Sequence, residues 1–128
     1  MKLVRTAHAK VNLALAVGLP SPPDPATGAA GLHPIASWMH AIDLADTVRM
    51  EWLGEHHPPR FGVVWAADAP RQSPIDWPRE KDLGVRALRL IEQAVGRTLP
   101  VDIRIEKRIP VGGGLGGGSS DAAAVMVG

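Results

Sequence analysis

The sequence predicts an α+β domain, because segments that alternate between apolar and polar residues occur together with a segment of helical spacing. The chain has 128 residues, which is enough for one domain of ordinary size. Hydrophobic residues make up 45% and charged residues 21%, which is the balance of a soluble globular protein. We find no internal repeat and no long linker, so we expect residues 1–128 to form a single domain.

Three segments alternate as β-strands with one buried face do, and they cover residues 11–17, 47–52 and 101–106. Residues 61–66 form a short apolar run that we expect to be a further strand. The first alternating segment also places Lys10 and Asn12 together on its polar side.

A helix is predicted from the helical spacing of Leu83, Ala87, Leu90, Ile91 and Ala94. The glycine at position 96 fits the C-cap of this helix. A second helix is predicted to start within residues 119–121, where two serines and an aspartate precede an alanine-rich stretch. Residues 18–34 contain five prolines and are predicted to be a loop, because proline cannot donate to a β-ladder.

Composition excludes several classes of protein. The net charge is +1, which gives no reason to expect a nucleic-acid partner. The absence of cysteine excludes disulfides and thiolate metal sites. No apolar run approaches the roughly 18–20 residues of a membrane span, and the first residues are too interrupted for a signal peptide. We therefore expect no membrane partner and a cytoplasmic location.

The most informative segment is the glycine-rich run at residues 110–120, which reads Pro-Val-Gly-Gly-Gly-Leu-Gly-Gly-Gly-Ser-Ser. Glycine adopts positive φ at little steric cost, so such a loop can turn its amides inward. A helix N-terminus follows, and its unpaired N–H groups favour an anion. The segment therefore predicts a phosphate cradle.

Three other interpretations of this run carry less weight. A Walker A loop requires lysine after its last glycine, and Ser119 stands there instead. The dinucleotide fingerprint G-x-G-x-x-G is matched, but a chance match is expected where glycine is so dense. A flexible linker is disfavoured because an apolar strand leads in and a helix leads out.

The run Pro110–Ala123 resembles the phosphate-binding motif of the GHMP kinases. Ala9–Leu15 is similar to that family's N-terminal A-K-[IVL]-N-L-x-L strand, and Gly31–Ile35 with Ile42–Asp46 is similar to its G-Y-H-x-L…DLxD segment. Lys81–Ala87 resembles D-N-L-x-x-[KR]-A, and Lys107–Pro110 matches K-x-[IL]-P. The closest form is the branch that phosphorylates 4-diphosphocytidyl-2-C-methyl-D-erythritol.

The resemblance implies the N-terminal ATP-binding domain of that family over residues 1–128, with a mixed β-sheet and helices on one of its sides. It implies transfer of the γ-phosphoryl group of ATP, with Mg²⁺, to a hydroxyl of the cytidine diphosphate methylerythritol substrate in the non-mevalonate isoprenoid pathway. The partners it implies are therefore ATP and a small molecule. The metal ligands are left open, with the hydroxyls of Ser119 and Ser120 as groups that could donate to the phosphates or help hold Mg²⁺. The oligomeric state is also left open.

The resemblance also implies roles for individual residues. Lys10 matches the catalytic lysine, Asn12 is a candidate contact for the substrate hydroxyl, and His33 matches the histidine that recognises cytosine. Leu32 replaces the usual tyrosine, which removes an aromatic platform for the base. The residues implied to contact the nucleotide are Lys107, Asp82, Pro110, Val111, Gly112, Gly113, Gly114, Leu115, Gly116, Gly117, Gly118, Ser119 and Ser120. Asp82 stands where asparagine is usual, and Lys107 is equally compatible with a solvated lysine at a strand end.

The family also uses a catalytic aspartate, which we expect to follow Gly128. We therefore expect this chain to be the N-terminal part of a longer kinase and to show little activity by itself. Two alternatives stay open: another GHMP kinase of the homoserine or mevalonate type, and a nucleotide-binding module without catalytic activity.

Overall fold

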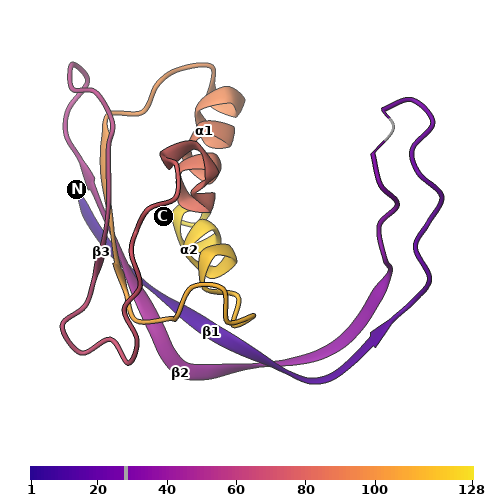
Figure 1. Ribbon diagram of the computed structural model, residues 1–128. Helices are drawn as coiled ribbons and strands as arrows, with labels where there is room; N and C mark the ends of the chain where they lie inside the picture. Colours follow the sequence, from indigo (N-terminus) through magenta and orange to yellow (C-terminus); the bar gives the residue numbers. More distant parts are fainter. Residues whose placement is uncertain (28) are drawn as a thin grey trace.

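The computed structural model describes residues 1–27 and 29–128, and it contains a four-stranded sheet with helices on one face (Figure 1). The strands are β1 (Lys2–Val17), β2 (Ile35–Trp52), β3 (Arg60–Trp65) and β4 (Val101–Lys107), in the spatial order β1-β2-β4-β3. β2 pairs antiparallel with β1 and β4, whereas β3 pairs parallel with β4. The prediction of an α+β domain with a mixed sheet is confirmed.

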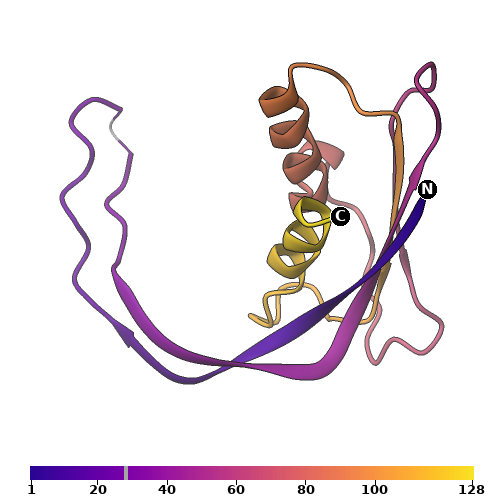
Figure 2. The same ribbon diagram turned by 180° about the vertical axis from the view of Figure 1, so that it is seen from behind.

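A short 3-10 helix, η1 (Arg79–Lys81), precedes α1 (Leu83–Val95), and α2 (Gly117–Met126) follows the glycine-rich run. Figures 1 and 2 show α1 and α2 on the same side of the sheet. α1 ends at Gly96 with a φ of +69°, as the sequence predicts. α2 begins before the predicted residues 119–121, because the left-handed Gly116 is its N-cap and the two serines lie inside the helix. Among the described residues, no helix is long and apolar enough to cross a membrane.

The hydrophobic core lies between the sheet and the helices. Alternate residues of β2 and β4 face it, as the period of two requires, and both helices contribute small and branched side chains. Its buried members are Ala7, Val48, Met50, Ala87, Leu88, Ile103, Ile105, Ala124 and Val125.

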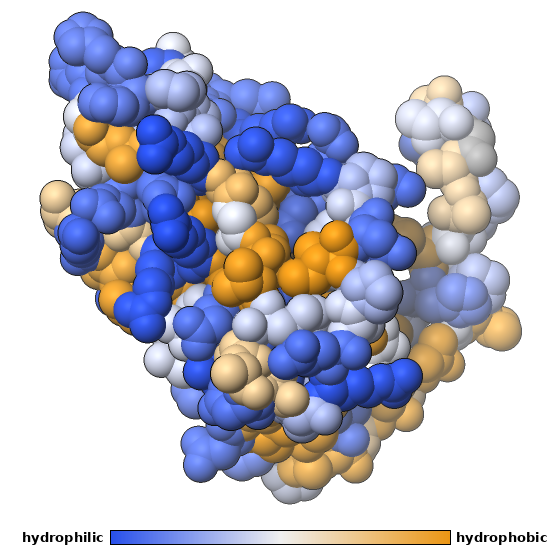
Figure 3. Space-filling model, turned by 60° about the vertical axis from the view of Figure 1, so that its left-hand side comes forward, coloured by the Kyte–Doolittle hydropathy of each residue, from blue (hydrophilic) through white to orange (hydrophobic). Residues whose placement is uncertain are grey.

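β1 and β2 are longer than predicted, and beyond Lys10 and Ala41 they leave the sheet as a curved hairpin (Figure 2). We call residues 11–41 the arm. The first half of β2 lacks a clean apolar alternation, which is why the sequence did not predict it as a strand. Figure 3 shows hydrophobic residues on the surface of the molecule. Those exposed along the arm are Leu13, Leu15, Val17, Leu19, Leu32, Ile35, Trp38 and Met39.

Two irregularities in the β1–β2 ladder flank Lys10 and Asn12. His8 pairs with Ala45 and Lys10 with Ala41, so β2 contains two extra residues at this point. After Asn12, β1 contains an extra residue instead. Bulges bend a strand and redirect its side chains. The lysine and the asparagine therefore lie in the segment where the hairpin turns away from the sheet.

Candidate active site

The glycine-rich loop, residues 110–116, connects β4 to α2, and three of its glycines have positive φ. The values are +77° at Gly112, +70° at Gly114 and +73° at Gly116. A Cβ atom at Gly112 or Gly114 would meet no described atom within 4 Å, so it is the backbone conformation that requires glycine at these positions. At Gly116 a Cβ atom would lie 3.1 Å from Cγ of Lys10, which shows how closely the loop approaches β1.

The N-terminus of α2 supplies the donors expected of a phosphate cradle. Its first backbone hydrogen bond runs from the N–H of Ser120 to the carbonyl of Gly116, at 2.9 Å. The amides of residues 117–119 precede this bond, so helix geometry gives them no helical acceptor. These amides and the helix dipole favour a negatively charged group.

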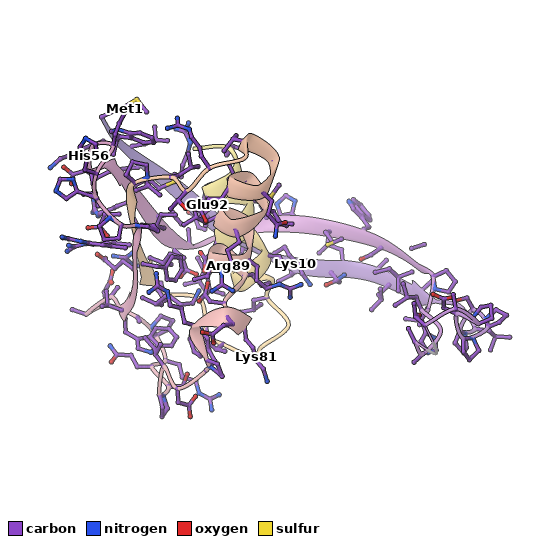
Figure 4. All side chains as sticks on the ribbon, turned by 90° about the horizontal axis from the view of Figure 1, so that it is seen from above. Met1, Lys10, His56, Lys81, Arg89 and Glu92 are labelled. Carbon is purple, nitrogen blue, oxygen red and sulfur yellow. The ribbon has the colours of Figure 1, made fainter. Side chains whose placement is uncertain are left out.

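A pocket of about 300 Å³ lies between this loop and the start of α1. Residues 109–119 line one side, and Trp77, Lys81, Asp82 and Leu83 line the other. Lys81 on η1 and Lys107 at the end of β4 also line the pocket. Figure 4 shows Lys10 at the base of the arm, from where it contacts the glycine-rich loop without lining the pocket. The pocket therefore combines backbone donors, cationic side chains and apolar walls.

Asp82 lines the pocket, as its predicted nucleotide role requires, but its carboxylate is already engaged. Oδ1 accepts hydrogen bonds from the amides of Gly84 (2.8 Å) and Val85 (3.4 Å) and thereby caps α1. Oδ2 accepts a hydrogen bond from Nε1 of Trp77 at 3.1 Å. Asp82 therefore shapes this wall by holding the indole and the helix start together.

Lys10 is attached to the glycine-rich loop through both its backbone and its side chain. Its N–H donates to the carbonyl of Leu115 at 2.9 Å, and Nζ donates to the carbonyl of Gly114 at 2.7 Å. Nζ also donates to Oδ1 of Asn12 at 2.6 Å, so the two polar residues of β1 are in contact, as the alternation predicts. The Asn12 amide donates in turn to Oγ of Ser37 on β2.

Lys107 is buried, with an exposed fraction of 4%, which excludes the solvated lysine that the sequence left open. Its Nζ forms ion pairs with Oδ2 of Asp46 on β2 and with Oδ2 of Asp121 on α2, the latter at 2.7 Å. Although burial lowers the pKa of Lys107, its two carboxylate neighbours outweigh this effect and hold the pKa above its usual value.

Of the two carboxylates that bind Lys107, Asp121 accepts fewer hydrogen bonds than Asp46. Its Oδ1 atom is buried and has no hydrogen-bond partner among the described residues. Burial raises the pKa of Asp121 to about 7, although the Lys107 ammonium acts in the opposite direction. The wall of the pocket thus contains a carboxyl group that titrates near neutrality.

Sequence reasoning missed Asp46, Asp121 and Trp77 as parts of this site. A signal for Asp46 and Lys107 was present in the alternation, because position 107 continues the buried face of residues 101–105 and position 46 continues that of residues 48–50. Two charged residues on buried faces of neighbouring strands must be paired. Trp77 lies in a loop whose sequence gives no such period.

His33 and Leu32 lie in the arm just before β2 begins at Ile35, and neither lines the pocket. Nδ1 of His33 is 2.9 Å from the carbonyl oxygen of Gly18, and Leu32 is 81% exposed. Along β1, Gly18 is eight residues beyond Lys10, a contour of about 26 Å at the usual strand rise. The structure therefore brings Lys10 and Asn12 to the loop but places His33 and Leu32 at a distance from it.

Among the described residues, no three histidine, cysteine, aspartate or glutamate side chains are grouped with metal-binding geometry. Mg²⁺ that accompanies a nucleotide does not require such a group, because phosphates and waters supply most of its ligands. The side chains with oxygen atoms that line the pocket are Asp82, Ser119 and Asp121. Asp82 caps α1 and Oδ2 of Asp121 binds Lys107, which leaves the Ser119 hydroxyl as the candidate ligand.

The fold and the loop define a class of protein. Residues 82–128, which comprise α1, β4, the loop and α2, match the family described as GHMP kinases N terminal domain. The chain belongs to the GHMP kinase superfamily and has the fold of its N-terminal domain.

Within this superfamily, the chain is similar to curated relatives that share one enzyme name. A 4-diphosphocytidyl-2-C-methyl-D-erythritol kinase of Anaeromyxobacter sp. (strain K) is 40% identical over 126 residues, which are 98% of this chain and 36% of the relative. The enzyme of the same name from Aromatoleum aromaticum is 40% identical over 122 residues, or 94% of this chain and 37% of the relative. The chain thus spans little more than a third of the length of these relatives.

Solved structures agree with the assignment to the GHMP kinase superfamily. A crystal structure of 4-(cytidine 5'-diphospho)-2C-methyl-D-erythritol kinase matches with a TM-score of 0.68 and 34% identity, over 98% of this chain and 38% of that one. Homoserine kinase from Cytophaga hutchinsonii matches with a TM-score of 0.50 and 20% identity, over 68% of this chain and 26% of that one. At this identity the second match concerns the fold alone.

Proposed function

We propose that this chain supplies the ATP-binding part of a kinase that phosphorylates a hydroxyl of 4-diphosphocytidyl-2-C-methyl-D-erythritol in the cytoplasm. The observation that carries the proposal is the attachment of Lys10 to the cradle through Leu115 and Gly114. A loop that binds phosphates is thereby joined to a cation beside it, and phosphoryl transfer depends on such positioning and charge stabilisation.

Each part of the site has a task in this proposal. The amides of residues 117–119 and the dipole of α2 bind the nucleotide phosphates. The Lys10 ammonium stabilises the charge that develops between the transferred phosphoryl group and the attacking hydroxyl, and Asn12 holds that ammonium in place. Mg²⁺ bound together with ATP would supply neutralisation of phosphate charge, and the hydroxyl of Ser119, which lines the pocket, would help to hold it.

The proposed function is tested with a chimera in which residues 1–128 replace the matching part of the Anaeromyxobacter relative. We expect transfer of the γ-phosphoryl group of ATP to 4-diphosphocytidyl-2-C-methyl-D-erythritol, and a loss of about 10²–10³-fold in Lys10→Met. Lys2→Met, which changes an exposed lysine on the same strand, is the matched control. The unfused chain should transfer phosphate only at the background rate.

Two results would contradict the proposal. One is a Lys10→Met chimera that is as active as the Lys2→Met control, because Lys10 would then have no part in the reaction. The other is transfer to homoserine or mevalonate in preference to the cytidine compound, which would assign the chain to another branch of the superfamily.

A further inference from the structure

A single buried carboxylate holds the segment that leads into the glycine-rich loop. Asp46, on β2, has an exposed fraction of 0%. Its Oδ1 atom accepts hydrogen bonds from the amides of Arg108 and Ile109, the latter at 2.8 Å, and its Oδ2 atom accepts one from Nζ of Lys107. Three consecutive residues at the end of β4 are therefore fixed by one side chain.

Two routes connect Asp46 to the N-terminus of α2. In the first, Ile109 packs beside Gly117 so closely that a Cβ atom there would lie 2.9 Å from Cγ2 of the isoleucine. In the second, Lys107 bridges Asp46 and Asp121, which is on α2. The helix end that carries the free amides is thus located on the sheet by an apolar contact and by an ion pair, and both begin at Asp46.

Asp46 does not line the pocket itself, so it acts through the residues it holds. Its charged neighbours besides Lys107 are Asp121, which shares that lysine, and Arg108. The guanidinium of Arg108 is directed to Asp68 and Glu106 and so does not compete for the Asp46 carboxylate. The hydrogen bonds to two amides have a direction that an ion pair alone would lack. This geometry fixes the backbone of residues 108–109, from which the loop starts.

We infer that Asp46 is a positioning residue for the phosphate cradle, acting through the backbone of residues 108–109 and through Lys107 rather than by contact with the ligand. This inference rests on the proposed function, because it takes the ligand of the loop to be the polyphosphate of a nucleotide. A cradle aligned by Asp46 contributes to the binding of ATP but not to that of adenosine, which has no phosphates.

The test compares Asp46→Asn with Asp43→Asn, which makes the same chemical change at an exposed position of the same strand. Titration calorimetry with ATP and with adenosine, at a temperature where every variant is folded, gives the ratio of the two affinities. We expect Asp46→Asn to lower this ratio by about tenfold or more, and Asp43→Asn to leave it within about twofold. A carboxylate needed only for stability would lower Tm and leave the ratio unchanged.

A second variant serves if Asp46→Asn fails to fold. Ile109→Leu keeps every charge, every backbone hydrogen bond and the side-chain volume, and it removes the Cγ2 atom that packs against Gly117. We expect it to lower the same ratio by about two- to fivefold; because Ile109 also lines the pocket, adenosine serves as the reference for any direct effect on the ligand. An unchanged ratio in whichever of the two variants is folded overturns the inference. If the unmutated chain itself shows no preference for ATP over adenosine, the proposed function fails first, and the two failures are therefore distinguishable.

Discussion

Replacement of Gly114 by alanine tests whether the cradle depends on the left-handed backbone of the loop. Gly114 has a φ of +70°, and a Cβ atom there would meet no described atom within 4 Å. The substitution therefore introduces conformational strain without a steric clash. For a residue with a Cβ atom, the left-handed conformation costs about 1–2 kcal/mol.

This strain should weaken nucleotide binding by a predictable factor. If the alanine variant relaxes out of the left-handed conformation, the carbonyl that accepts the hydrogen bond from Lys10 turns away, and the cradle must be re-formed when ATP binds. The required 1–2 kcal/mol corresponds to a loss of about 5–30-fold in affinity. Titration calorimetry with ATP measures this factor directly.

Gly113→Ala is the matched control for this experiment. Gly113 has no positive φ, and the nearest atom that its Cβ would meet is 3.7 Å away, an ordinary contact. We expect it to bind ATP within about twofold of the unmutated chain. The reasoning is refuted if Gly113→Ala and Gly114→Ala weaken binding equally, because backbone conformation would then not be the cause.

Two further predictions concern stability. Folding raises the pKa of Asp121 from 3.8 to about 7. Between about pH 4 and pH 7 the unfolded chain has therefore already released this proton, whereas the folded chain still holds it. The contribution of Asp121 to the free energy of unfolding thus decreases as the pH rises through this range. Urea unfolding across this range should show that the unmutated chain loses stability relative to Asp121→Asn, and a difference independent of pH would contradict this. Asp82→Ala should lower the free energy of unfolding by about 1 kcal/mol through loss of the α1 cap, whereas Asp82→Asn, which keeps an acceptor oxygen, should lose less. Equal losses in urea unfolding of the two variants would show that the cap is not the cause.

The sequence predicts the regular parts of the fold well and the irregular parts poorly. Residues 101–106 and 83–94 follow clean periods of two and of 3.6, so β4 and α1 are found with nearly correct ends. The first half of β2 is missed because its extra residues opposite β1 break the alternation, and periodicity methods depend on an unbroken period.

The site, too, contains parts that local sequence predicts and parts that it does not. The cradle and Lys10 are predicted from local motifs, and in the structure Nζ of Lys10 donates to the carbonyl of Gly114 in the glycine-rich loop. The pairing of Asp46 with Lys107 depends on two strands 61 residues apart, so only the register of the sheet determines it. Likewise, the side chain at position 82 must accept hydrogen bonds from the Gly84 amide and from Trp77. A motif comparison does not show these two contacts.

The contact between Lys10 and the loop has a consequence for the order in which the protein is made. The lysine and Gly114 are 104 residues apart, so at a synthesis rate of about 5–20 residues per second the lysine is complete about 5–20 s before its partner. All residues of the β1–β2 hairpin, which ends at Trp52, are likewise made before the loop. The hydrogen bond between Lys10 and Gly114 therefore requires both ends of this chain, and no N-terminal segment that stops before Gly114 contains the complete contact.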